Sequence, residues 1–434
     1  MKNIFVVGFE PFNVALLRSL PNANDYAFHN LLSYKEAIRP TSGRIDFDAL
    51  LALAEKRLSD FNGSVDAIMS YWDFPASAIV PVLCRRHKLP GPPLRAVAAC
   101  EHKYWARLEQ QESIPAFVPR FCAVDPFTDD PLASIDLPFP FWIKPIKAHS
   151  SYLGFRIADR SDFQTHLPII RENIARFGDA FNAFLKLIDL PAGVAGIGGN
   201  HCIAEEIISE GEQCTLEGYV HGGEVVVYGI VDSIRTGRHQ SCFSRYQYPS
   251  RLPASVRERM IEAARRFMSH IGYDNAPFNV EFYWDSKTDQ TRLLEVNTRL
   301  SKSHSPMFKM VDGVSHQKIA IDLALGRRPE LPHRQGQYSI AAKFMTRVFD
   351  DGVVVRVPSQ VDIERFSLAF PDGLYRPMVK EGDRLAHLMF QDSYSFEIAE
   401  LFLGADSEAE LLEKHDAALK LLPFDFEPLE PKAA

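Results

Sequence analysis

Two carboxylates and an amide stand at alternating positions in two neighbouring segments of the chain, residues 278–284 (FNVEFYW) and 291–299 (TRLLEVNTR). Successive side chains of a strand point to opposite faces, so the apolar residues of each segment would share one face. Glu281 would then lie on the polar face of the first segment, and Glu295 and Asn297 on that of the second. The short polar loop between the segments predicts an antiparallel hairpin that brings the two glutamates side by side.

Adjacent carboxylates repel each other unless a cation lies between them. Mg²⁺ suits this place because it prefers hard oxygen ligands and takes one or two carboxylates together with substrate phosphates. Asn297 adds a neutral oxygen roughly 7 Å along the strand from Glu295, a spacing that suits a second ion. Arg299 offers a planar fork to a phosphate or carboxylate. The alternative is an exposed hairpin face whose acids and arginine pair across the surface, and the pattern alone does not separate the two.

The elements that must position these residues are predicted from apolar periodicity and from breaks rich in proline and glycine. A buried strand at 4–7 ends at Gly8, helical patterns follow, and a second buried strand fits 65–71, which indicates a small α/β domain with a parallel sheet. Gly8 is either a turn glycine or part of a ligand site. Breaks at 89–93 (LPGPP) and 331–337 (LPHRQGQ) predict three domains. They are an N-terminal α/β domain (1–93), a central α+β region (94–330) and a small C-terminal α+β domain (331–434).

The run E-V-N-T-R at 295–299 resembles the closing metal motif of the ATP-grasp superfamily, E-x-N-P-R, with Thr298 where proline is common. The strand N-V-E-F before it matches the first metal-binding carboxylate of that family. The resemblance implies an ATP-grasp fold, mixed α+β and α/β. A Rossmann-like N-terminal domain would precede a two-lobed ATP-binding region whose small lobe spans about residues 120–210.

Further stretches follow the family's order. Lys103 resembles the lysine that opens the grasp fold, Lys144 in FWIKP resembles the strand lysine that contacts nucleotide phosphates, and residues 148–154 resemble the loop that covers them. CIAEEIISEGE resembles the hinge that holds adenine, where Glu205 would meet the adenine amino group and Glu212 the ribose hydroxyls. The complete ATP-binding set implied is Lys103, Lys144, Glu205, Glu206, Ile207, Ile208 and Glu212, with Glu281, Glu295 and Asn297 as metal ligands.

The resemblance implies transfer of the γ-phosphoryl group of ATP to a carboxylate, followed by attack of an amine on the acyl phosphate. Chain length and the extra C-terminal domain are similar to stand-alone L-amino acid ligases. A carboxylase or other acyl-phosphate enzyme, or a nucleotide-binding module that has lost catalysis, are the alternatives. The catalytic side chains expected are Arg299, Lys302 and His304, although a histidine in such a place is commonly structural. The substrate residues expected are Glu217, Arg245, Ser301 and Ser303.

The implied cofactors are ATP and two Mg²⁺ ions, with Mn²⁺ as a substitute, and the partners are small carboxylates and amines. The chain of 434 residues has 46% hydrophobic residues and a net charge of -8, with no Lys/Arg run, which argues against nucleic acid as a partner. With no apolar run long enough to span a bilayer and no signal-peptide pattern, we expect a cytoplasmic protein without a membrane partner. A homodimer is the general expectation for such an enzyme. The six cysteines stand singly, which indicates neither a zinc site nor a disulfide framework.

Overall fold

The computed structural model describes residues 1–434 apart from 41–42, 149–151, 210, 237–241, 389–394 and 429–434. The chain forms two compact units. The first unit comprises Met1–Tyr228, Leu252–Lys302 and Gln317–Glu330; the second comprises Gly229–Arg251, Ser303–His316 and Leu331–Ala434. The division into three domains at residues 93 and 330 stays a prediction.

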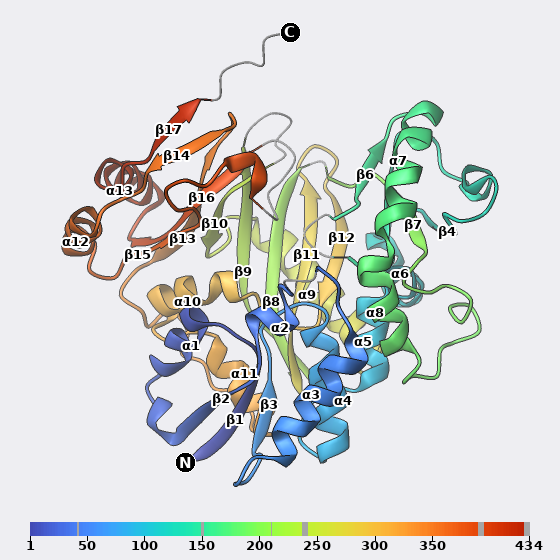
Figure 1. The fold of residues 1–434 in the computed structure, drawn as a ribbon, viewed down its shortest axis with the longest axis horizontal. Helices are drawn as coiled ribbons and strands as arrows, with labels where there is room; N and C mark the ends of the chain where they lie inside the picture. Colours follow the sequence, from blue (N-terminus) through green and yellow to red (C-terminus); the bar gives the residue numbers. More distant parts are fainter. Residues whose placement is uncertain (41–42, 149–151, 210, 237–241, 389–394, 429–434) are drawn as a thin grey trace. The chain divides into compact units, whose positions relative to one another are not determined.

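The N-terminal part of the first unit is a small parallel sheet in the order β2-β1-β3, so the predicted parallel α/β arrangement is confirmed. Its buried apolar strands are flanked by helices, among which α3 and α4 pack against the sheet (Figure 1). The elements are β1 (Lys2–Phe9), α1 (Pro11–Arg18), η1 (Ala23–Asp25), β2 (Tyr26–Ser33), α2 (Tyr34–Ala37), α3 (Phe47–Ser59), β3 (Ala67–Met69), α4 (Ala76–His87) and α5 (Leu94–Glu101).

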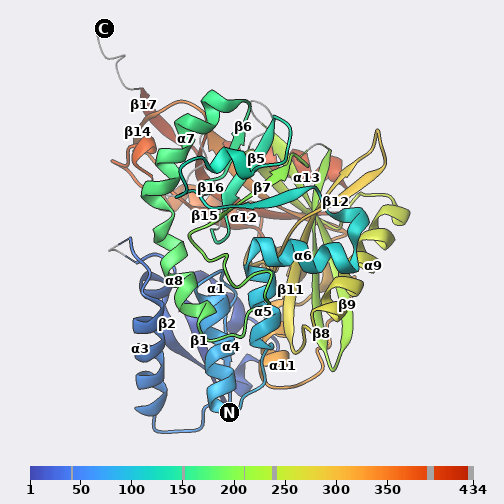
Figure 2. The same cartoon turned by 90° about the vertical axis from the view of Figure 1, so that its right-hand side faces the viewer.

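A four-stranded antiparallel sheet in the order β4-β7-β5-β6 follows, within the span predicted for the small lobe. Helix α7 runs along this sheet (Figure 2) because Phe163, Ile170 and Ile174 share one core with Phe141 and Ile143 of β5. The elements are α6 (Lys103–Ser113), η2 (Pro115–Phe117), β4 (Phe121–Val124), η3 (Pro131–Ser134), β5 (Phe141–Pro145), β6 (Phe155–Ile157), α7 (Arg160–Asn173), α8 (Ala175–Leu185) and β7 (Cys202–Glu206).

The last sheet of the first unit runs in the order β12-β11-β8 and continues into the first residues of β9. All of its pairings between β8, β11 and β12 are antiparallel. Phe278, Val280 and Phe282 of β11 are fully buried on its apolar face, as the alternation predicts. The elements are β8 (Glu212–His221), β9 (Glu224–Thr236), α9 (Ala254–His270), β11 (Ala276–Asp285), β12 (Gln290–Asn297) and α11 (Gln317–Ala324).

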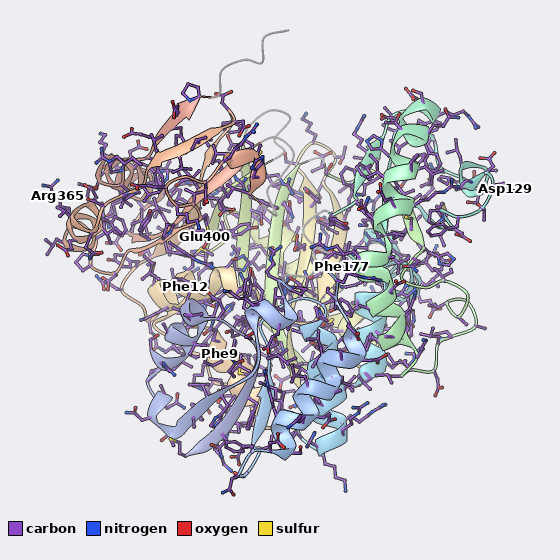
Figure 3. The ribbon with its side chains drawn as sticks, viewed as in Figure 1. Phe9, Phe12, Asp129, Phe177, Arg365 and Glu400 are labelled. Atoms are coloured by element: carbon purple, nitrogen blue, oxygen red, sulfur yellow. The ribbon has the colours of Figure 1, made fainter. Side chains whose placement is uncertain are left out.

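The second unit holds the rest of β9 and the strand order β9-β10-β13-β16-β15, with a separate pair β14-β17. Helices α12 and α13 share a core with β13 and β16, and Glu400 of β16 is labelled in Figure 3. The elements are β10 (Cys242–Tyr248), η5 (Lys302–His304), α10 (Ser305–Asp312), β13 (Ile340–Val348), β14 (Gly352–Arg356), α12 (Gln360–Ala369), β15 (Leu374–Pro377), η6 (Leu385–His387), β16 (Phe396–Ala405), α13 (Glu408–Leu421) and β17 (Asp425–Pro428).

Among the residues that the structure describes, none of the helices has the length and apolar character needed to cross a membrane.

Candidate functional site

The carboxylate pair lies on the antiparallel hairpin β11–β12 of the first unit. Glu281 is directly opposite Glu295, and Asn279 is directly opposite Asn297. Directly opposed residues have Cβ atoms about 4.5–5.5 Å apart, so the two carboxylates share one surface. Gln213 Nε2 on β8 donates to Glu281 Oε2 at 2.9 Å, and Asn297 Nδ2 donates to Asn279 Oδ1 at 2.8 Å. The predicted hairpin and the side-by-side placement of the two acids are confirmed.

The charge of the carboxylate pair is offset only in part by the protein, because Arg299 lowers the pKa of Glu281 but does not cancel the upward shift. Burial and the facing carboxylate of Glu295 raise the pKa of Glu281 to about 7. Within the described part of the chain, no ion pair joins Glu281 or Glu295 to a basic side chain. Arg299 forms its ion pair with Asp73, although its charge also lowers the pKa of Glu281.

The oxygen atoms at this surface fit a hard divalent cation. Glu281 and Glu295 offer carboxylate oxygens, and the amide of Asn297 offers Oδ1, because its Nδ2 is used as a donor to Asn279. Mg²⁺ binds such oxygens and would remove the repulsion between the two acids. The assignment of these three residues as metal ligands remains a prediction that the donor set supports.

The residue after Asn297 is tied to a buried acid of helix α5. Thr298 Oγ1 donates to Glu101 Oε1 at 2.8 Å, and the Lys147 ammonium forms an ion pair with the same carboxylate. Burial by itself would raise the pKa of Glu101, but Lys147 outweighs it and the net shift is downward. A proline at position 298 would have no hydroxyl, so the departure from the E-x-N-P-R pattern adds a hydrogen bond here.

Arg299 is held by an acid from the N-terminal part of the first unit. Arg299 Nε donates to Asp73 Oδ1 at 2.7 Å, and Nη2 lies 2.6 Å from the same oxygen. Burial would lower the pKa of the guanidinium, but Asp73 outweighs it, so the net shift is upward. The group is therefore a permanent cation with a fixed orientation.

The two lysines predicted to contact phosphates lie in the first unit, and both have protein partners. Lys103 Nζ donates to the carbonyl oxygen of Ala148 at 2.9 Å, and burial together with the neighbouring Lys147 lowers the pKa of Lys103 to about 7. Lys144 Nζ lies 2.6 Å from Glu205 Oε2. Of the predicted phosphate-covering loop 148–154, residues 149–151 lie outside the described residues.

Glu205 sits between two cations. Besides Lys144, Arg107 Nε donates to Glu205 Oε1 at 2.5 Å. Burial would raise the pKa of Glu205, but Arg107 and Lys144 outweigh it and bring the pKa to about 2. Arg107 also donates to the carbonyl oxygens of Leu293 and Leu294 at 2.9 Å each, which ties β7 to strand β12.

The remaining hinge residues follow β7. Glu206 accepts from Arg120 Nε at 2.6 Å, Ile207 and Ile208 are half-buried between β7 and β8, and Glu212 is exposed at the start of β8. Their roles toward adenine and ribose stay predictions, as does that of Glu205.

The expected substrate residues fall in both units. In the first, Glu217 is fully buried and accepts from the backbone N–H of Ser301 at 3.2 Å. In the second unit, Arg245 Nη2 pairs with Glu408 at 2.7 Å, and Ser303 lies in η5. His304, expected to be catalytic, is buried in the same unit with its ring edge-on to that of Tyr246. The expected catalytic and substrate roles of these residues stay predictions.

Several residues around the site were missed at the level of sequence, namely Trp72, Asp73, Glu101, Arg107 and Lys147. Two weak signals existed. Lys147 is the second lysine of IKPIK, and the W-D pair follows a predicted buried strand, where the ends of parallel strands gather polar residues. The other partners come from helices far along the chain, where no local pattern indicates them.

Comparison with known proteins agrees with this geometry. Residues 221–332, which include the carboxylate pair and Asn297, match the family model described as carbamoyl-phosphate synthase L chain, ATP binding domain. The uncharacterized protein y4rH of Sinorhizobium fredii is 22% identical over 367 residues, which cover 81% of this chain and 69% of that protein.

Among solved structures, the L-amino acid ligase from Bacillus licheniformis superposes with a TM-score of 0.73 at 16% identity, covering 98% of this chain and 99% of that one. The biotin carboxylase domain of the Hydrogenobacter thermophilus 2-oxoglutarate carboxylase, in complex with MgADP, ADP and bicarbonate, gives 0.61 at 15% identity, covering 98% of this chain and 91% of that one. At these identities the likeness speaks for the fold. Together with the carboxylate hairpin and the matched segment, it shows that this chain has the ATP-grasp fold.

Proposed function

We propose that the chain is an ATP-dependent ligase that joins a carboxylate to an amine through an acyl phosphate, acts on amino acids, and releases ADP and phosphate. The observation that carries the proposal is the pair Glu281–Glu295 with Asn297 beside it. Two acids held face to face with only partial compensation from Arg299 cost free energy, and a bound metal ion that carries a nucleotide would offset that cost.

The reaction requires positioning and charge neutralisation more than a nucleophilic side chain. A divalent cation at Glu281, Glu295 and Asn297 would supply the positive charge that ATP phosphates need during transfer. Lys103 and Lys144 would add point charges near the phosphates, and Arg299 would hold the transferred group or the substrate carboxylate. The low pKa of Lys103 makes its charge sensitive to pH near neutrality, and a bound polyphosphate would raise that pKa again.

Amino acids are the substrate class we favour because the L-amino acid ligase superposes over nearly the whole length of both chains, including the second unit. A carboxylase is the second candidate. The observations behind it are the family model matched at 221–332 and the superposition on the biotin carboxylase domain, which is less close in TM-score. A module without catalysis is disfavoured by the complete set Glu281, Glu295 and Asn297.

The test is a screen of amino acids in pairs for release of ADP and phosphate, with bicarbonate as a separate arm. We expect turnover only when both an acid and an amine are present. Turnover that depends on bicarbonate and needs no amine would move the assignment to a carboxylase.

The variant Glu295→Gln keeps the shape of the side chain but removes its charge, so it should fold normally and lose turnover by about 1,000-fold or more. Asp289→Asn is the matched control, because Asp289 lies on the same hairpin but is exposed and pairs with Arg259. Near-normal turnover by Glu295→Gln would contradict the metal assignment.

A further inference from the structure

The loop after β3 places two consecutive residues, Trp72 and Asp73, against the segment that follows the carboxylate hairpin. The indole of Trp72 is fixed in the first unit. Its Nε1 donates to the carbonyl oxygen of Gly8 at 2.8 Å, and the backbone N–H of Trp72 donates to Ser70 Oγ at 3.1 Å. The centroids of the Trp72 and Tyr34 rings lie 5.0 Å apart. These contacts leave the ring little freedom.

Gly8 is shaped to this ring. Its φ is +80°, a conformation that side chains rarely adopt, and a Cβ added there would lie 2.3 Å from Trp72 Cδ1. Of the two interpretations of Gly8, a turn or part of a ligand site, the contact favours a turn glycine that makes room for the indole.

Each member of the pair holds one basic side chain from beyond β12. The Lys302 ammonium lies 4.3 Å from the centroid of the Trp72 ring, and Asp73 accepts from Arg299 Nε. The backbone between these two basic residues is held as well, because Ser301 N–H donates to the buried carboxylate of Glu217. The segment 299–302 is thus held at three of its four residues.

We propose that Trp72 and Asp73 are positioning residues that hold Lys302 and Arg299 together as donors for an oxyanion. This inference rests on the proposed function, in which a phosphate and a carboxylate both occur. Asp73 contacts Nε and Nη2 of a guanidinium that has five N–H donors. Long basic side chains lose much rotamer freedom when they bind, so fixing them beforehand favours binding.

The experiment measures binding by calorimetry, with Mg·ADP, inorganic phosphate and acetate as probes. Each oxyanion is titrated both into the protein alone and into the protein saturated with Mg·ADP, so that a phosphate and a carboxylate preference are distinguished. We expect Asp73→Asn to weaken binding of the preferred oxyanion about 10-fold and to change the Kd for Mg·ADP by less than about 2-fold. Trp72→Leu should act in the same direction, and Trp72→Phe should keep most of the affinity because the ring remains.

The matched control is Glu36→Gln, which removes a carboxylate from an arginine pair of similar length, Arg57 Nη2 to Glu36 Oε1 at 2.8 Å, in the same N-terminal part of the unit. This variant should leave every Kd unchanged. Unchanged oxyanion affinity in Asp73→Asn, an equal loss of Mg·ADP affinity, or a wild-type protein that binds neither oxyanion would overturn the inference. A wild-type protein that binds an oxyanion but no Mg·ADP would instead refute the proposed function. The oxyanion affinities of the wild type and Asp73→Asn would then still test the positioning role of Asp73.

Discussion

Glu205 on β7 and Glu281 on β11 are both carboxylates in restricted surroundings, but their electrostatic environments are opposite. Glu205 is 4% exposed and lies between Arg107 and Lys144, so its pKa falls to about 2. Burial and the facing carboxylate of Glu295 raise the pKa of Glu281 to about 7. The protein therefore balances the charge of Glu205 with two cations, but it balances the charge of the Glu281–Glu295 pair only in part.

The two regions are also linked through the backbone. Arg107, which balances Glu205, donates to the carbonyl oxygens of Leu293 and Leu294 just before Glu295. A structural ion pair thereby fixes the strand that carries Glu295. This arrangement is what preorganisation of a metal site requires.

The largest expected effect comes from removing the balance at Glu205. Arg107→Met should lower the free energy of unfolding by about 3–5 kcal/mol. The substitution leaves the buried carboxylate of Glu205 with one cation instead of two, and it removes two hydrogen bonds to carbonyl oxygens of β12. Urea unfolding at pH 7 measures this effect. Arg259→Met, at the exposed pair with Asp289, is the control and should change stability by less than about 1 kcal/mol. Equal losses in both variants would show that the buried Arg107–Glu205 pair contributes no more to stability than an exposed pair.

A smaller effect is expected from protonation of Glu281. The folded protein binds this proton more tightly than the unfolded chain, where the pKa is 4.5, so the stability it contributes is complete below pH 4.5 and lost as the pH rises through about 7. Between pH 5 and pH 8 the stability of the wild type relative to Glu281→Gln should fall by about 2 kcal/mol. Millimolar Mg²⁺ with ADP should restore it at pH 8. A difference that does not vary with pH would show that burial and Glu295 do not raise the pKa of Glu281.

The smallest effect concerns Glu101, a second acid whose charge is balanced by the protein. Thr298→Val removes the hydroxyl that donates to it while Lys147 stays, so stability should fall by about 1 kcal/mol. Thr298→Ser should keep the wild-type value. Thermal unfolding of the two variants side by side gives the comparison, and an equally destabilised serine variant would assign the loss to the methyl group instead.

Local patterns were sufficient for the hairpin and for most elements around it. Alternation in 278–284 and 291–299 predicted both strands, the polar loop predicted their antiparallel pairing, and the register places Glu281 opposite Glu295. The buried strand expected at residues 4–7 lies within β1. These features depend on neighbours within a few residues, which is why they could be predicted.

The partners of the charged residues could not be predicted in the same way. The ammonium of Lys144, for which a phosphate contact is predicted, pairs with Glu205. Arg299 pairs with Asp73, which lies 226 positions earlier in the chain. Ion pairs of this kind depend on which segments the fold brings together. The positions of charged residues in the sequence do not indicate which of them will pair when they are far apart in the chain.

By itself, the sequence determined the apolar faces, the hairpin with its two facing acids, and the order of motifs that resembles the ATP-grasp superfamily. The tertiary structure alone decided which acids are balanced and which are not. The physical reason is that hydrophobic alternation acts between adjacent residues of one strand, whereas the pKa of a carboxylate depends on every charge within a few ångströms, whatever its position in the chain.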